Sequence, residues 1–193
     1  SNSFQTKGLV VGYVQSGKTA SFTSVISKAA DRDFRVIIVL AGMTNILRKQ
    51  TQERLEREII SLNPDRWFPW TDGQSDLSLR GNSLTRNTNA LVSTGAAKRH
   101  LAVIKKNVSA MKALIRMFSE LPVALKNETP VLIIDDECDH ASLNSAPQRN
   151  RVSTINKLLN EIINSMPRIA YVGYTATPYA NVLVDPGNDD LYP

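Results

Sequence analysis

The sequence predicts an α/β fold in which a mainly parallel sheet is covered by helices on both faces, as a three-layer sandwich. Short, almost wholly apolar runs recur along the chain, as expected of strands buried on both sides. Amphipathic segments of helical period lie between these runs, and strands that alternate with helices form parallel sheets. The length of 193 residues fits a single domain with a complete hydrophobic core.

The first half of the alternation follows from local patterns. The apolar run 8–14 predicts a strand, and residues 20–30 predict a helix. The run 34–40 is rich in β-branched residues, so we expect a second buried strand there. Apolar residues spaced among charges predict a helix over 45–62, and Asn63-Pro64 ends it.

The segment 64–88 departs from this alternation, and we expect an irregular insertion loop there. It contains both tryptophans, Trp67 and Trp70, together with two turn-rich stretches. A loop of this length inside a compact domain commonly serves a function. The tryptophans fit two roles: they could stack on a nucleic-acid base or, as we favour, cap a local core.

Regular alternation resumes after the insertion. The remaining strands are expected at 89–93, 100–105, 130–135 and 168–173. Two amphipathic segments, 108–121 and 152–165, predict helices between them. The tail 185–193 resembles a linker or a cut end.

Composition and charge limit the classes of function. No apolar stretch reaches the length of a membrane span and no signal-peptide pattern opens the chain, so a cytoplasmic protein without membrane partners is expected. The single cysteine, Cys138, excludes an internal disulfide, and with only two histidines it argues against a structural zinc site. The net charge of +5 mildly favours polyanionic partners, although a solvated basic surface explains it equally well.

A phosphate-binding motif follows the first apolar run. Gly12-Tyr-Val-Gln-Ser-Gly17-Lys18-Thr19 matches G-x-x-x-x-G-K-[ST], and its setting between a strand and a helix points backbone N–H groups at phosphates. The motif predicts ATP and Mg²⁺ as cofactors, with Lys18 on the β- and γ-phosphates and the Thr19 hydroxyl on Mg²⁺. The expected nucleotide-binding residues are Gly12, Gln15, Ser16, Gly17, Lys18, Thr19 and Ala20.

A cluster of acids closes the apolar strand 130–135. Ligands of open α/β sheets bind at the carboxyl ends of the strands, where one acid can hold Mg²⁺ opposite Thr19 and the next can activate water. In the pattern D-E-x-D/H, Asp136 is the metal-side catalytic acid and Glu137 the catalytic base. Asp135 is then an extra acid, and the register could slip by one residue. Acids here would also suit a helix N-terminus, so the catalytic interpretation depends on the nearby phosphate motif.

A third motif, Gly173-Tyr-Thr-Ala-Thr-Pro178, follows the last predicted strand. The hydroxyls of Thr175 and Thr177 flank a small residue and could hydrogen-bond Asp139 or His140, which assigns these four residues to coupling. For His140, a satisfied polar residue is an equally good interpretation. The three motifs, taken in this order, resemble those of the first motor domain of superfamily-two helicases.

A closer resemblance, to the Z-one domain family, covers most of the chain from residue 8 to about residue 186. It rests on the phrases GYVQSGKTA at 12–20, VLAGMTN at 39–45 with Leu47-Arg48 and Gln50-Thr51, DECDHAS at 136–142 and GYTATPYAN at 173–181. This family is described as an endonuclease-associated domain of bacterial and phage-defence proteins. The resemblance implies a RecA-like P-loop ATPase fold and a helicase-like action on DNA.

The resemblance also implies partners and contact residues. The segment 41–50 corresponds to one that touches the nucleic-acid backbone, with Arg48 as the first candidate and Lys49 and Arg54 as weaker ones. Lys105, with its neighbour Lys106, could face the ligand edge, although we favour a solvated turn. The implied partners are DNA, a second motor domain in the same full-length chain, and nuclease or other defence subunits.

That second domain would supply an arginine finger, and nothing after Thr177 could encode it. The chain is therefore expected to be a fragment of a larger multidomain protein, weakly active or inactive alone. Gln5 lies too close to the phosphate motif for an adenine-reading glutamine, so base preference stays open. Two alternatives to the motor remain: a metal-dependent endonuclease built on the same acids, and a nucleotide-gated interaction module.

Overall fold

The computed structural model describes residues 3–11, 18–136, 138 and 146–175, with residues 18–20, 22 and 146–152 described as backbone only. The strands are β1 (Phe4–Val11), β2 (Val36–Ala41), β3 (Trp67–Pro69), β4 (Arg99–Ile104), β5 (Val131–Asp136) and β6 (Arg168–Thr175). The helices are α1 (Lys18–Asp31), α2 (Asn45–Leu55) with the π-helical turn η1 (Glu56–Ile60), α3 (Ser83–Thr94), α4 (Val108–Ser119), α5 (Val123–Asn127) and α6 (Ala146–Ser165).

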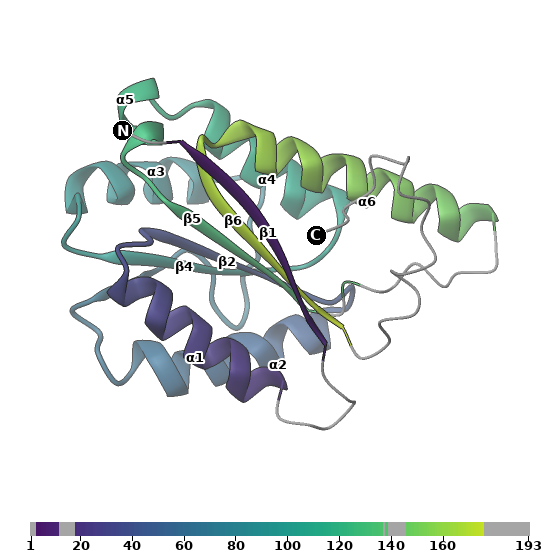
Figure 1. Cartoon of the computed structure of the whole chain (residues 1–193), viewed down its shortest axis with the longest axis horizontal. Helices are drawn as coiled ribbons and strands as arrows, with labels where there is room; N and C mark the ends of the chain where they lie inside the picture. The colour runs from purple at the N-terminus through teal and green to yellow at the C-terminus, as the bar shows by residue number, and fades with distance from the viewer. Residues whose placement is uncertain (1–2, 12–17, 137, 139–145, 176–193) are drawn as a thin grey trace.

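The strands of the described residues form one all-parallel sheet in the order β1-β6-β5-β2-β4-β3. Every residue of β2 and β4 is buried, which agrees with their nearly continuous apolar sequences. Figure 1 shows α4 and α6 on one side of the sheet and α1 and α2 on the other. The predicted α/β three-layer sandwich with a parallel central sheet is therefore confirmed.

Strand alternation divides the core into two halves. Ile38, Ala102 and Ile133 pack toward α3, α4 and α6 together with Tyr171. Their strand neighbours pack toward α1, α2 and η1 in a second cluster, which includes Ile37, Val39, Ile134 and Tyr174. Each residue of a central strand therefore belongs to a known face of the sheet, because successive side chains point to opposite sides.

Two expectations for the middle of the chain were wrong. The segment 64–88 is not wholly irregular, because β3 pairs with β4 at the sheet edge and α3 begins at Ser83. The strand expected at 89–93 belongs to α3 instead. The buried residues of α3 recur at helical spacing: Leu84, Asn87, Ala90 and Leu91. The short apolar run at 89–93 does not reveal this spacing, because so short a run fits a strand as well as a helix.

Both tryptophans lie in the core, as favoured from the sequence: Trp67 is 4% exposed and Trp70 is 2% exposed. The indole Nε1–H of Trp70 donates to Nδ1 of His100 at 3.0 Å. Since an indole can only donate, the imidazole proton lies on Nε2, which is 3.0 Å from the Thr94 hydroxyl. That hydroxyl donates onward to the Ala90 carbonyl at 2.7 Å. Burial lowers the pKa of His100 from 6.5 to about 4.

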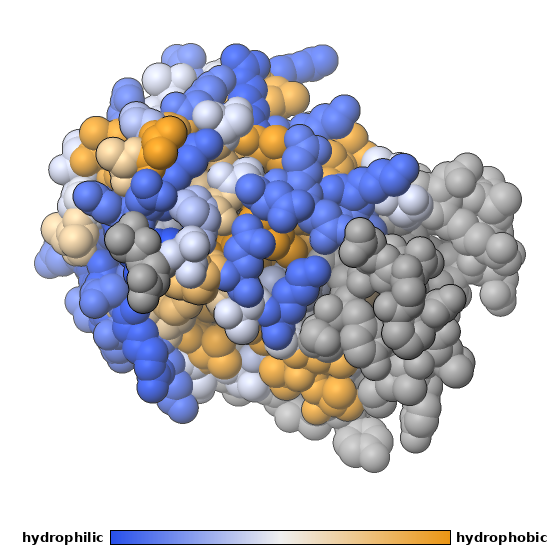
Figure 2. All heavy atoms as spheres, turned by 45° about the horizontal axis from the view of Figure 1, so that its top comes forward, coloured by the Kyte–Doolittle hydropathy of each residue, from blue (hydrophilic) through white to orange (hydrophobic). Residues whose placement is uncertain are grey.

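Polar and charged side chains cover much of the described surface that Figure 2 presents. Figure 2 shows apolar side chains as separate patches among polar and charged ones on the face it presents. No helix within the described part of the chain has both the length and the apolar character needed to cross a membrane.

Candidate active site

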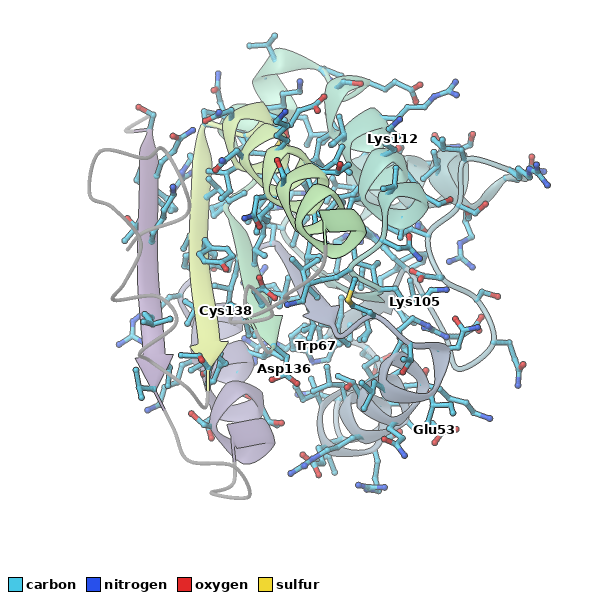
Figure 3. All side chains as sticks on the ribbon, turned by 90° about the vertical axis from the view of Figure 1, so that its right-hand side faces the viewer. Glu53, Trp67, Lys105, Lys112, Asp136 and Cys138 are labelled. Atoms are coloured by element: carbon cyan, nitrogen blue, oxygen red, sulfur yellow. The ribbon has the colours of Figure 1, made fainter. Side chains whose placement is uncertain are left out.

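The carboxyl ends of the parallel strands meet along one edge of the sheet. Strand register places Val10, Tyr174, Asp136 and Ala41 in one row across β1, β6, β5 and β2. Val11 ends β1, and the predicted phosphate motif starts at the next residue in the sequence. The phosphate motif and the acidic motif therefore leave the sheet at the same level, with one strand between them. Figure 3 shows Asp136, Cys138 and Lys105 at this edge.

The helix that adjoins the phosphate motif begins two residues earlier than the predicted start at residue 20. α1 starts at Lys18, so Lys18, Thr19 and Ala20 form its first turn, which contains no acidic residue. Tyr174 is fully buried beneath this helix, and its hydroxyl lies 3.5 Å from the Ser21 hydroxyl. The strand before the motif and the helix after it are thus both present.

The neighbouring aspartates Asp135 and Asp136 point to opposite faces of the sheet. Asp135 lies on the face of Tyr171, which packs with α4 and α6. Asp136 follows Leu132 and Ile134 onto the other face, which α1 and α2 cover. This alternation answers the question of register, because Asp136 shares its face with the helix that follows the phosphate motif.

Asp135 is occupied by two partners. It is 3% exposed, and its Oδ1 forms an ion pair with Lys106 Nζ at 2.5 Å rather than a well-aligned hydrogen bond. Its Oδ2 accepts a hydrogen bond from the Tyr171 hydroxyl at 2.9 Å. Burial and the neighbouring Asp135 charge raise the pKa of Tyr171, so this phenol stays protonated and donates. The favoured solvated turn is therefore wrong for Lys106, which is buried.

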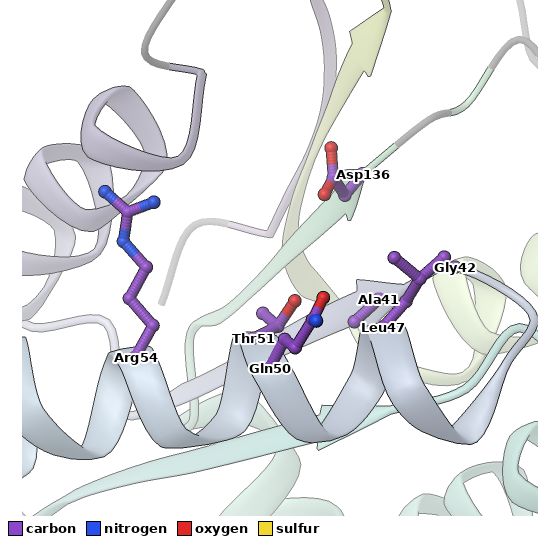
Figure 4. A pocket seen from close by; sticks show the side chains of 7 residues that line it. All are labelled: Ala41, Gly42, Leu47, Gln50, Thr51, Arg54 and Asp136. Carbon is purple, nitrogen blue, oxygen red and sulfur yellow. The ribbon is translucent and has the colours of Figure 1, made fainter. Parts of the chain in front are cut away.

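Asp136 lines an open cavity of about 230 Å³ beside the row of strand ends. The opposite wall comes from α2, as Figure 4 shows, and the lining residues are Ala41, Gly42, Leu47, Gln50, Thr51, Arg54 and Asp136. Gln50 and Thr51 belong to the resemblance to the Z-one family, but neither was predicted to face Asp136. Their helical spacing from Leu47 and Arg54 could have identified a common face.

Arg54 connects this cavity to the neighbouring helix. Its Nε–H donates to Glu58 at 2.9 Å, and the same carboxylate accepts from the Thr23 hydroxyl of α1 at 3.3 Å. Arg54 was expected as a weaker nucleic-acid contact. The structure places it in the wall of the cavity, between α2 and α1.

Cys138 packs against β6 directly after the acidic strand end. Its backbone N–H donates to the Tyr174 carbonyl at 3.0 Å. A Cβ atom added to Gly173 would lie 2.9 Å from Cys138 Sγ, closer than real Cβ contacts. A side chain at position 173 would therefore force Cys138 or the strand to shift. Thr175, one of the predicted coupling residues, is fully buried at the end of β6.

Arg48 is the main correction among the nucleic-acid candidates. It is 4% exposed, and its guanidinium donates to the carbonyls of Asp72 at 2.9 Å, Gly73 at 3.2 Å and Val103 at 3.4 Å. Its donors hold the loop after β3 against α2, so the side chain is not presented to nucleic acid. The expectation for Arg48 was wrong because the loop folds back over it.

The two other candidates stay at the surface or near it. Lys49 has a half-exposed side chain that pairs with Glu53 at 3.6 Å on the same helix. Lys105 is half-buried, and its backbone N–H donates to the Asp76 carboxylate at 3.2 Å. Burial raises the pKa of Asp76, although this hydrogen bond opposes the shift.

Gln5 lies at the opposite end of β1 from the phosphate motif. Its side-chain amide donates to the Ile163 carbonyl at 3.3 Å. The remaining predicted site residues lie outside the described part of the chain: Gly12, Gln15, Ser16, Gly17, Glu137, Asp139, His140 and Thr177.

No protein-family model and no curated protein matches the chain. Among solved structures, a Drosophila ORC bound to DNA is 14% identical over 88% of this chain and 82% of its own, with a TM-score of 0.29. The Aeropyrum pernix ORC2 protein, in ADPNP–ADP complexes, is 14% identical over 90% of this chain and 44% of its own, with a TM-score of 0.28. These similarities are too low to carry an argument, so the resemblance to the Z-one family stays a prediction.

Proposed function

We propose that this chain binds and hydrolyses ATP with Mg²⁺, as the first motor domain of a helicase-like protein that acts on DNA. One observation carries the proposal: Asp136 and the helix that follows the phosphate motif share one face of the sheet. The row of strand ends adds that the two motifs leave the sheet at the same level, from strands separated by β6 alone. A phosphate-binding loop and a metal-binding carboxylate need this proximity.

The described residues fit a metal-bound triphosphate. The backbone N–H groups in the first turn of α1 have no partners within the helix, and such groups bind anions. The absence of acidic residues from that turn means that no carboxylate there repels phosphate. A carboxylate on the same face, at the wall of an open cavity, supplies the hard oxygen ligand that Mg²⁺ prefers.

Each residue has a distinct role in the proposal. Lys18 neutralises phosphate charge, Thr19 and Asp136 hold the metal, and the Glu137 carboxylate takes a proton from the attacking water. Bound Mg²⁺ would neutralise charge that develops on the phosphate oxygens. Thr175, with Asp139, His140 and Thr177, links this site to the end of β6.

The burial of Asp135 favours the ATPase over the endonuclease. A nuclease would use Asp135 with its neighbours to hold metals, but its carboxylate is already paired with Lys106 and Tyr171. The two aspartates at the end of β5 are better explained as a metal ligand, Asp136, and a buried residue paired within the protein, Asp135.

Action on DNA is the finer part of the proposal. The net charge of +5 and the partly exposed Lys49 and Lys105 near the carboxyl edge support a polyanionic partner. Arg48 does not contribute, because its donors are taken by the loop after β3.

ATP turnover with and without DNA tests the proposal, measured on the full-length protein and on this chain. Glu137→Gln should keep nucleotide binding and lower turnover by about a hundredfold or more, because the general base is lost. Glu161→Gln changes an exposed glutamate on α6 and serves as the matched control. Unchanged turnover in Glu137→Gln would exclude this residue as the base, and no ATP binding by the unaltered protein would refute the proposal.

A further inference from the structure

The buried group Lys106–Asp135–Tyr171 joins three segments at the carboxyl edge of the sheet. Asp135 ends β5, Tyr171 belongs to β6, and Lys106 lies between β4 and α4. The side chains of Lys106 and Asp135 are only 7% and 5% exposed. Because removing charges from water is costly, an apolar pair of similar volume would often be at least as stable here. The pair is therefore poorly explained by stability alone.

Lys106 also contacts Gly42, a residue of the cavity wall. Its backbone N–H donates to the Gly42 carbonyl at 2.9 Å, directly after β2. Gly42 lines the cavity together with Asp136. One residue thus connects the end of β2, through its backbone, to the end of β5, through its side chain.

The direction of Asp136 depends on the residue before it. Successive side chains of a strand point to opposite faces, so a rotation that turned Asp136 away from α1 would draw Asp135 out of its buried position. Two contacts oppose that rotation: the ion pair with Lys106 and the hydrogen bond from Tyr171. The peptide between the two aspartates is held from the α4 side of the sheet.

We propose that Lys106, Asp135 and Tyr171 are positioning residues that hold Asp136 in the orientation needed to bind the metal of a nucleotide. This inference rests on the proposed function and deepens it. It assigns to the α4 side of the sheet a role in the metal affinity of a site on the α1 side. The three residues do not touch nucleotide or metal themselves.

The test is a Mg²⁺ titration of the binding of a fluorescent ATP analogue to this chain. Tyr171→Phe removes one hydroxyl from the group, and the half-saturating Mg²⁺ concentration should rise about tenfold, as when metal sites lose outer hydrogen bonds. Analogue affinity without metal should not change, because the phosphate motif is intact. Thr129→Val removes a buried hydroxyl just before the other end of β5 and should leave the Mg²⁺ midpoint unchanged.

A second variant separates positioning from stability. Lys106→Met combined with Asp135→Leu and Tyr171→Phe replaces the whole polar group by apolar side chains and leaves no buried hydroxyl without an acceptor, which commonly preserves the fold. We expect a normal thermal unfolding midpoint together with the raised Mg²⁺ requirement. A wild-type Mg²⁺ midpoint in Tyr171→Phe or in a folded triple variant would overturn the positioning role. Failure of the unaltered chain to bind the analogue would instead refute the proposed function.

Discussion

The contact between Gly173 and Cys138 gives a sharp prediction for one methyl group. Gly173→Ala places a Cβ 2.9 Å from Cys138 Sγ and 3.3 Å from the Tyr171 hydroxyl, where ordinary contact begins at 3.4 Å. The sulfur or the strand must therefore move by about 0.5 Å. Gly173 also pairs with Asp135 across the sheet, so the displacement would reach the acidic strand end.

The expected cost of this substitution follows from two opposing effects. Overpacking in a well-packed core destabilises by about 1–3 kcal/mol. Replacing glycine by alanine within a strand contributes about 0.5–1 kcal/mol in the other direction, since less backbone entropy is lost on folding. We expect a net decrease of up to about 2.5 kcal/mol in the free energy of unfolding, or up to roughly 10 °C in melting temperature for a chain of this size.

Gly8→Ala is the matched control, in the adjacent strand β1. A Cβ at Gly8 meets its nearest atom, the Tyr171 carbonyl oxygen, at 4.0 Å, so this variant should be as stable as the unaltered chain or slightly more stable. Calorimetric melting of both variants makes the comparison. Equal stability of the two would show that Cys138 does not pack on Gly173 as described.

Three further predictions concern the core and the site. Burial lowers the pKa of His100 in the folded protein from 6.5 to about 4. Neutral His100 therefore contributes fully to the free energy of unfolding above pH 6.5, and this contribution is lost as the pH falls toward 4. Urea titrations should show a loss of up to about 3 kcal/mol over that range, absent from His100→Asn. Arg48→Met should lower stability by about 1–3 kcal/mol without changing DNA affinity, whereas Lys49→Met should weaken DNA binding without loss of stability. Asp136→Asn should abolish the Mg²⁺ dependence of nucleotide binding while metal-free binding persists.

The strand and helix pattern was largely readable from local sequence. Apolar runs such as those of β2 and β5 are buried on both faces, and their composition shows it without knowledge of their partners. The region around α3 was misassigned for a physical reason. β3 is only three residues long and is held by pairing with β4, some thirty positions later in the chain, which no local pattern reports.

The amino-acid sequence by itself determined the fold class and the order of the motifs, because periodicity and motif spacing depend on neighbouring residues. Only the tertiary structure decided which of two adjacent aspartates faces α1. That choice depends on Lys106 and Tyr171, which are 29 and 36 positions from Asp135 in the sequence. The tertiary structure also decided that Arg48 is buried. The sequence shows an arginine at this position, but not whether its side chain faces solvent or a loop that folds back over it. Burial and pairing arise from long-range contacts, and these form only when the chain has folded.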